Sequence, residues 1–231
     1  MAFQDYSQAR YSKAPPERNV TRRKAPLRRP ALYRTGFKRA LDIMLVLASL
    51  PVTLPIALML MGLVALDGHS PIYRQKRIGR GGRVFHIVKI RTMVPGADAL
   101  LEQCLEADPE ARREWDETQK LKSDPRITPI GGALRKCSLD EVPQLWNVLK
   151  GDMSLVGPRP MMVDQQALYP GTAYFDLRPG ITGLWQVSDR NDSSFAARAG
   201  FDTRYLASLS LSLDLAILFR TVVVVLRGTG H

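Results

Sequence analysis

The sequence predicts a mainly helical α+β protein with a monotopic membrane segment, one small β-hairpin and a cytosolic helical domain. Residues 43–66 carry no charge, and a run of this length is long enough to enter or cross the hydrocarbon core of a bilayer. Two strand-like patterns flank a glycine-rich turn between residues 72 and 91, as in a hairpin. The clearest patterns after the hairpin have apolar residues three and four positions apart, which is typical of amphipathic helices.

The positive charge is concentrated near the N-terminus. The 231 residues are 45% hydrophobic, enough for a core, and carry a net charge of +11, which favours an anionic partner. Residues 1–40 hold eleven Lys and Arg against two acidic residues, a net of +9, which leaves +2 for the rest. We expect residues 1–36 to be a disordered basic arm attracted to anionic membrane lipids. A nucleic-acid-binding protein is the alternative, but the remainder has no recognisable groove-reading element, so we expect no nucleic-acid partner.

Residues 37–68 are expected to enter the membrane and return to the same side. Pro51 and Pro55 lie near the middle of the apolar run, where each removes a backbone donor and bends a helix. Both flanks are basic, and basic flanks favour the cytoplasmic face. We therefore expect a re-entrant helix–break–helix with the membrane break at these two prolines. The alternative is a spanning helix with a proline kink.

The cytosolic domain, residues 69–205, is expected to begin with the hairpin, whose strands lie near 72–77 and 84–91. Strand alternation places Phe85, Ile87, Lys89 and Arg91 on one face of the second strand. The two cations can receive a phosphate, or they can form a solvated edge that protects the strand. The glycines of the turn match no nucleotide-binding loop and are expected only to shape the hairpin.

Other helices are expected before and after the central part of this domain. Residues 98–122 predict two surface helices with a break near Pro109, and residues 206–231 predict an amphipathic helix on the membrane surface. Cys104 and Cys137 match neither a disulfide framework nor a zinc site. Both thiols are therefore expected to be free, in a reducing compartment.

The residues best suited to chemistry are an acidic pair, Asp140 and Glu141, at the expected start of a short helix. The apolar stripe of that helix consists of Val142, Leu145, Trp146 and Leu149, with Gly151 as its stop. Pro143 suits only a first turn, which places the helix start near Asp140. Ser138 with Glu141 alternatively fits a capping box. In both cases the pair can be a purely structural feature that the helix dipole stabilises.

Two arginines near the pair favour a chemical role instead. Arg135 lies one loop before the pair, and Arg159 lies in a Gly-Pro-Arg-Pro sequence whose prolines restrict the backbone around it. An anchored arginine suits phosphate binding, and carboxylates beside arginines are what phosphoryl transfer requires. The alternative for Arg159 is a solvated polyproline turn. The chain contains no Asp-x-Asp, which argues against a conventional metal-dependent glycosyltransferase.

Together these motifs resemble one family, the bacterial sugar transferases that attach a hexose-1-phosphate to polyprenyl phosphate, known as monotopic phosphoglycosyl transferases. Besides the proline-broken apolar segment, the motifs are FKRALD (37–42), YRQKRIG (73–79), FHIVKIRTM (85–93), DPRITPIGGALRKCSLDEVPQLWNVLKGDMSLVGPRP (124–160) and RPGITGLWQVSDRND (178–192). The chain is most similar to the short members that initiate exopolysaccharide synthesis from UDP-galactose or UDP-glucose.

The resemblance implies a catalytic domain on the cytoplasmic face of the bacterial inner membrane. Asp140 matches the family nucleophile, which forms a phosphosugar–aspartyl intermediate and releases UMP. Glu141 matches the second member of the Asp-Glu dyad, and the two carboxylates would hold Mg²⁺. The residues assigned to substrate phosphate binding are Arg135, Arg159, Lys89, Arg91 and Arg126. The implied partners are a UDP-hexose and undecaprenyl phosphate, and a homodimer is left open.

The chain departs from the family pattern at the membrane break. The family commonly has Ser-Pro there, whereas this sequence has Leu54-Pro55. Leucine cannot hydrogen-bond to the carbonyls of the preceding turn as serine can, so it is open how the backbone groups freed by Pro55 are satisfied. A non-catalytic membrane scaffold for polysaccharide assembly is a further interpretation, which an assay of UMP release would test.

Overall fold

A computed structural model describes residues 32–118, 121–188 and 195–226. Residues 1–31 of the expected basic arm therefore lie outside the described residues. The same holds for residues 189–192 of the RPGITGLWQVSDRND motif and for the last five residues of the tail. A π-helical turn at Tyr33–Phe37 leads directly into helix α1 at Lys38–Ala65. Helical structure thus begins a few residues before the expected end of the arm at residue 36.

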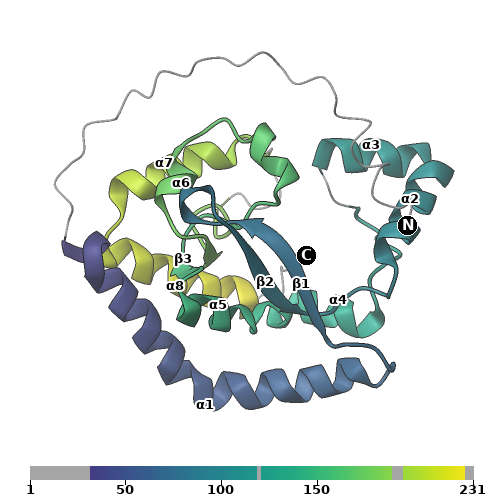
Figure 1. The fold of residues 1–231 in the computed structure, drawn as a ribbon, viewed down its shortest axis with the longest axis horizontal. Coiled ribbons are helices and arrows are strands. Elements are labelled where there is room, and N and C mark those ends of the chain that lie inside the picture. Colours follow the sequence, from purple (N-terminus) through teal and green to yellow (C-terminus); the bar gives the residue numbers. More distant parts are fainter. Residues whose placement is uncertain (1–31, 119–120, 189–194, 227–231) are drawn as a thin grey trace. The chain divides into compact units, whose positions relative to one another are not determined.

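Helix α1 is continuous through both of its prolines, so the expected helix–break–helix is instead one bent helix. Figure 1 shows the change of direction near its middle. In this segment Thr53 Oγ1 donates to Ser49 O at 3.0 Å, and Ser49 Oγ donates to Val46 O at 2.8 Å. These bonds do not reach Leu47 O or Pro51 O, the carbonyls that lose a donor to Pro51 and Pro55, but hydroxyl bonds of this kind and prolines both favour a bend in a helix.

The first half of α1 is held against the cytosolic domain by polar contacts. Arg39 Nη1 donates to Val148 O at 2.6 Å. The buried carboxylate of Asp42 accepts hydrogen bonds from Ser154 Oγ at 2.7 Å and from Leu155 N at 3.2 Å. Beside these contacts lies a core cluster made of Val46, Phe85, Ile87, Val148 and Met153.

The second half of α1 returns to the same domain. Its Val64 is buried against Ile90 and Leu134, and Arg91 Nη2 donates to Val64 O at 3.2 Å and to both carboxylate oxygens of Asp67. Many apolar side chains between the two docked ends are exposed; they include Leu47, Val52, Leu54, Leu58 and Met59. Among the described residues, α1 is the one helix long and apolar enough to cross a membrane.

The expected hairpin is confirmed. Strands β1 (Ile72–Ile78) and β2 (Val84–Ile90) pair antiparallel, with Ile72 opposite Ile90 and Ile78 opposite Val84. A 3₁₀ turn at Arg80–Gly82 connects them, and Gly81 at φ 69° adopts the left-handed conformation that glycine tolerates best. A second, parallel pair joins β3 (Ser154–Val156) to β4 (Gly180–Thr182), and the sequence patterns did not predict it.

Short helices complete the central part of the domain. The two expected surface helices are confirmed as α2 (Ala97–Ala107) and α3 (Pro109–Thr118). Helix α4 (Pro129–Lys136) starts where Thr128 Oγ1 accepts a hydrogen bond from Gly131 N at 2.9 Å, a standard N-cap. The remaining elements are a 3₁₀ turn at Leu139–Glu141, α5 (Gln144–Lys150), a 3₁₀ turn at Asp164–Leu168 and α6 (Ala173–Asp176).

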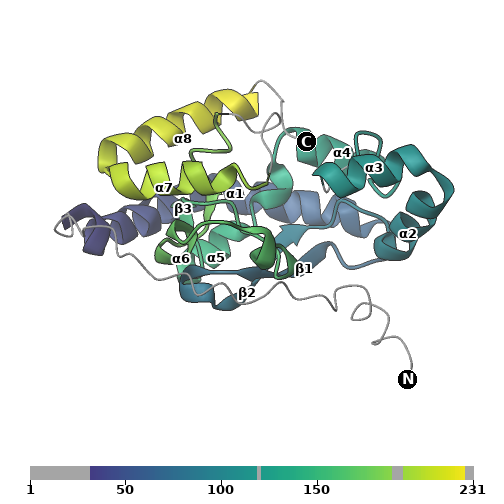
Figure 2. The ribbon, with the colours of Figure 1, turned by 90° about the horizontal axis from the view of Figure 1, so that it is seen from above.

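The C-terminal part is helical, as expected, but it is divided differently. Helix α7 (Arg198–Ser208) ends after residue 206, and α8 runs from Leu211 to Leu226. Figure 2 shows both helices on the side of the domain away from β1 and β2. Asp214 of α8 is 1% exposed, and its carboxylate accepts bonds from Tyr33, Lys38 and Tyr205 at 2.6–2.7 Å. This carboxylate cluster ties α8 to α7 and to the start of α1.

Candidate active site

The acidic pair lies in a separate 3₁₀ turn, Leu139–Glu141, between α4 and α5. Ser138, which precedes the turn, has φ 55° and is the one non-glycine residue with positive φ in the described part of the chain. Such a conformation is costly for a residue with a side chain, so the surrounding packing must hold it in place. The turn leaves Asp140 7% exposed and Glu141 half-buried.

The structural interpretation of the pair as a helix start is confirmed in part. Asp140 and Glu141 lie in the first turn of the short 3₁₀ helix Leu139–Glu141, whereas helix α5 itself begins at Gln144 with Pro143 as its N-cap. The capping box is absent, because Ser138 makes no side-chain cap bond. The predicted apolar stripe is confirmed in part: Leu145 and Leu149 pack against the core cluster that contains Val148, whereas Trp146 is 60% exposed. Gly151 does end the helix, at φ 91°, as expected for a C-terminal glycine.

Lys89 reaches both carboxylates from strand β2. Its Nζ donates to Glu141 Oε1 at 2.7 Å and lies 3.8 Å from Asp140 Oδ2. Strand alternation buries Phe85 and Ile87 on the same face, so the ammonium extends from the core toward the pair. This face is therefore not a solvated basic edge.

The two predicted arginines both lie close enough to Asp140 to influence its charge. Arg135, in the last turn of α4, is oriented by a 2.9 Å bond from its Nε to Thr92 Oγ1. Arg159 Nη2 lies 3.9 Å from Glu141 Oε1. The Arg159 loop is held by the β3–β4 pair, where Gly157 approaches so closely that an added Cβ would lie 2.3 Å from Arg178 O. The backbone before Arg159 is therefore closely packed, and the Arg159 side chain is 30% exposed, so it is not a fully solvated tip.

Burial and these cations act in opposite directions on Asp140. Removal from water raises the pKa of the Asp140 carboxyl above its ordinary value, and the negative charge of Glu141 adds to this effect. The positive charges of Lys89, Arg135 and Arg159 lower the pKa again. The site thus holds a poorly hydrated carboxylate among cations, a combination that suits a nucleophile.

A small, partly open hollow lies beside Glu141, and Asp140 is not among its lining residues. Its lining includes Glu141, Lys89 and Arg159 together with two residues that the sequence reasoning missed, Arg77 and Gln144. Burial and the neighbouring Arg159 lower the pKa of the Arg77 guanidinium to about 10. Arg77 belongs to the YRQKRIG motif, which was identified in the sequence without assigning Arg77 to phosphate binding.

The structure does not bring Arg91 and Arg126 to the pair. Arg91 binds Asp67 at the end of α1, with its Nη2 at 2.7 Å from Oδ1. Arg126 forms a buried fork with Asp124, with bonds of 2.8 and 2.6 Å, and its guanidinium stacks on Trp115. Both guanidinium groups already have carboxylate partners, so their predicted role in phosphate binding stays a prediction without support from this geometry.

Comparison with known proteins identifies the family of this chain. A family model described as "Bacterial sugar transferase" matches residues 33–228. The chain belongs to the bacterial sugar transferase family. The membership confirms the resemblance drawn from the motifs and makes the protein an enzyme of the transferase class.

Individual relatives of this sugar transferase carry more specific names. It is 50% identical over 195 residues to a UDP-galactose-lipid carrier transferase of Erwinia amylovora, covering 84% of this chain and 41% of the relative. It is 46% identical to the exopolysaccharide production protein ExoY of Sinorhizobium fredii, covering 84% and 87%. An undecaprenyl-phosphate galactose phosphotransferase of Salmonella typhimurium is 47% identical, covering 84% and 41%. The chain thus spans less than half of two of these relatives and most of the third.

Proposed function

We propose that this sugar transferase moves hexose-1-phosphate from UDP-galactose or UDP-glucose to undecaprenyl phosphate, with release of UMP, and so initiates exopolysaccharide synthesis. The observation that carries the proposal is the buried Asp140 carboxylate, with Lys89 3.8 Å away and Arg135 and Arg159 close enough to lower its pKa. The names of the relatives from Erwinia, Sinorhizobium and Salmonella support the class of donor, acceptor and product.

In the first step, an Asp140 oxygen attacks the phosphorus that carries the sugar. The bond between this phosphorus and the bridging oxygen breaks, and UMP leaves with the electron pair. Lys89, Arg77 and Arg159 line the hollow with positive charge, which offsets the repulsion between the carboxylate and the diphosphate. In the second step, a phosphate oxygen of the lipid attacks the same phosphorus, and the Asp140 carboxylate departs.

Mg²⁺ fits the residues of the site as a cofactor shared with the substrate. Groups of three or more His, Cys, Asp or Glu suited to a metal are absent from the described residues, and Asp140 and Glu141 are two adjacent carboxylates. Mg²⁺ in proteins commonly uses one or two carboxylates and completes its shell with substrate phosphates and water. The pair would hold the ion, which would supply neutralising charge to the phosphates.

The acid limb of the pH–rate profile tests the charge balance at Asp140. Lys89 lowers the pKa of that carboxyl, and the nucleophile acts in its ionised form. Lys89→Met is therefore expected to raise the pKa of Asp140, so that kcat/KM begins to fall at a higher pH than in the wild type as the solution is acidified. A limb that stays in place or moves to lower pH would contradict this assignment. Lys150→Met, at a half-exposed side chain paired with Asp152, is the matched control.

We also propose that α1 is re-entrant and that the catalytic domain lies on the cytoplasmic face of the inner membrane. The two docked ends of α1 carry this proposal. A straight helix of 28 residues is about 42 Å long at 1.5 Å per residue, and a span would place its ends on opposite sides of the bilayer. Both ends instead contact one domain through Asp42 and Val64, and the exposed apolar middle is left for the lipid.

Cysteine labelling tests this topology. In a chain with both native cysteines replaced by serine, Gly36→Cys and His69→Cys place thiols at exposed positions just before and just after α1. A membrane-impermeant maleimide is expected to label both positions in inside-out vesicles and neither in right-side-out vesicles. Labelling of the two positions from opposite sides would show that α1 spans the membrane.

The activity itself is tested by incubating the full chain with a UDP-hexose, undecaprenyl phosphate and Mg²⁺. UMP and a lipid-linked hexose are expected in equal amounts, and comparison of UDP-galactose with UDP-glucose identifies the sugar. Absence of UMP with every UDP-sugar would favour a non-catalytic scaffold.

A further inference from the structure

Several buried side-chain atoms without hydrogen-bond partners belong to residues that line two hollows beside Arg159. In the described residues, four buried side-chain atoms make no hydrogen bond: Arg77 Nε, Gln144 Nε2, Gln186 Oε1 and Arg198 Nε. Arg77 and Gln144 line the hollow beside the acidic pair, and Arg198 lines an adjoining hollow that shares Arg159 as a wall. All three of these residues leave N–H donors unused. Folded proteins pair nearly all buried polar groups, so the arrangement indicates a ligand rich in acceptor oxygens.

Gln144 is the clearest of the three. It is 2% exposed, it is the first residue of α5, and it lies one turn beyond Asp140 in the chain. The residue lines the hollow together with Lys89 and Glu141, and its buried Nε2 has no hydrogen-bond partner. An unpaired buried amide destabilises the folded protein, so its retention at this position requires a compensating use.

Asn147, on the same helix, shows how an amide with a structural role behaves. It is 1% exposed, but both ends of its amide are bonded. Its Nδ2 donates to His86 O at 2.8 Å, and its Oδ1 accepts from Val88 N at 3.1 Å, which joins α5 to β2. The contrast within one helix indicates that packing of α5 does not account for Gln144.

We propose that Gln144 is a substrate-contacting residue whose Nε2 donates a hydrogen bond to a non-bridging oxygen of the phosphoryl group that is transferred. This inference rests on the proposed function. The neighbouring Arg77, Lys89 and Arg159 supply positive charge, whereas the amide supplies a directed donor without a charge of its own. A preorganised donor of this kind stabilises negative charge where it develops during displacement at phosphorus.

The test combines stability, binding and turnover in Gln144→Met, which keeps the approximate shape and removes the donor. The matched control is Gln103→Met, the same change at an exposed position on α2. We expect the thermal midpoint of Gln144→Met to equal or exceed that of the wild type, because the change removes an unpaired buried donor. UDP, the probe ligand, is expected to bind about tenfold more weakly, and UMP release to be roughly 10- to 100-fold slower. The control is expected to match the wild type in all three.

Several results would overturn the inference. Wild-type UDP affinity and turnover in Gln144→Met would show that the amide does not contact the substrate, and a lowered midpoint with unchanged UDP affinity would show a structural role. If methionine impairs folding, Gln144→Glu preserves the shape and replaces the donor with a negative charge; undiminished UDP binding by that variant would also exclude the contact. A wild type that binds UDP through Gln144 but releases no UMP would refute the proposed transferase activity and leave the phosphate contact intact.

Discussion

Replacing Asp140 by asparagine is expected to abolish the burst of UMP that we expect from the wild type in the absence of lipid acceptor. Steady-state UMP release is expected to fall by roughly a thousandfold or more, as when other covalent nucleophiles are removed. The amide has nearly the same shape as the carboxylate but cannot form the aspartyl phosphate. Because the nearest ion-pair partner of Asp140, Lys89 Nζ, lies 3.8 Å from its Oδ2 and also bonds to Glu141, the variant is expected to fold.

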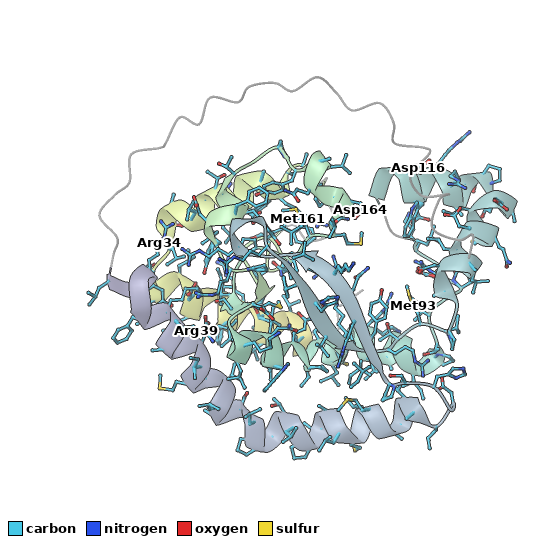
Figure 3. All side chains as sticks on the ribbon, viewed as in Figure 1. Arg34, Arg39, Met93, Asp116, Met161 and Asp164 are labelled. Carbon is cyan, nitrogen blue, oxygen red and sulfur yellow. The ribbon has the colours of Figure 1, made fainter. Side chains whose placement is uncertain are left out.

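The measurement is UMP release with a UDP-hexose, followed by mass spectrometry for the phosphosugar adduct on the peptide that contains residue 140. Asp116→Asn is the matched control, since Figure 3 places Asp116 on α3, away from the hairpin, and its side chain is exposed. UMP release by Asp140→Asn at the wild-type rate would mean that another residue is the nucleophile, whereas loss in the control as well would point to a general defect in folding.

Replacing Asp214 by alanine is expected to lower the free energy of unfolding by about 3–5 kcal/mol, the usual cost of breaking a buried ion pair. The change removes the partner of the Lys38 ammonium, whose side chain is 14% exposed, and the carboxylate acceptor of the Tyr33 and Tyr205 hydroxyls. Tyr205 keeps Val156 O as an acceptor at 3.2 Å. Asp214 joins α8 and α7 to the start of α1, so the loss is expected to loosen the attachment of the membrane helix.

Thermal unfolding in detergent measures this effect, and a drop of about 10 °C is expected for a protein of this size. Asp214→Asn keeps one acceptor and is expected to be intermediate, while Asp176→Ala, at an exposed position at the end of α6, is the control. An Asp214→Ala midpoint equal to that of the control would show that the cluster contributes little.

Much of the fold was visible in the sequence where local patterns decide it. The uncharged run forms α1, and the alternating patterns around the glycine turn form the β1–β2 hairpin. The break near Pro109 separates α2 from α3. The short β3–β4 pair was not predicted, because three-residue strands carry no periodicity. The expected break in the membrane helix is a bend, because nearby hydroxyls bond to the backbone in the same segment.

The candidate site was predicted in part. Asp140, Glu141, Lys89 and Arg159 do meet. Arg126 does not join them, because its guanidinium forms an ion pair with Asp124, two residues earlier. The Asp-x-Arg spacing in the sequence could have predicted this pairing. Arg77 and Gln144 were missed because both look like ordinary surface residues in the sequence, and only their burial beside the pair reveals their unused donors.

The sequence by itself determined which chemical groups are present and which segments are apolar, turn-forming or helical, since these properties depend on residues close together in the chain. Only the tertiary structure decided which cations reach Asp140 and which are taken by other carboxylates. It also decided that Asp140 and Glu141 lie in a short 3₁₀ turn that precedes α5, and that both ends of α1 contact one domain. These outcomes depend on burial and on contacts between distant segments. A polar or charged group that is removed from water destabilises the protein unless it finds a partner, so burial decides which pairs form.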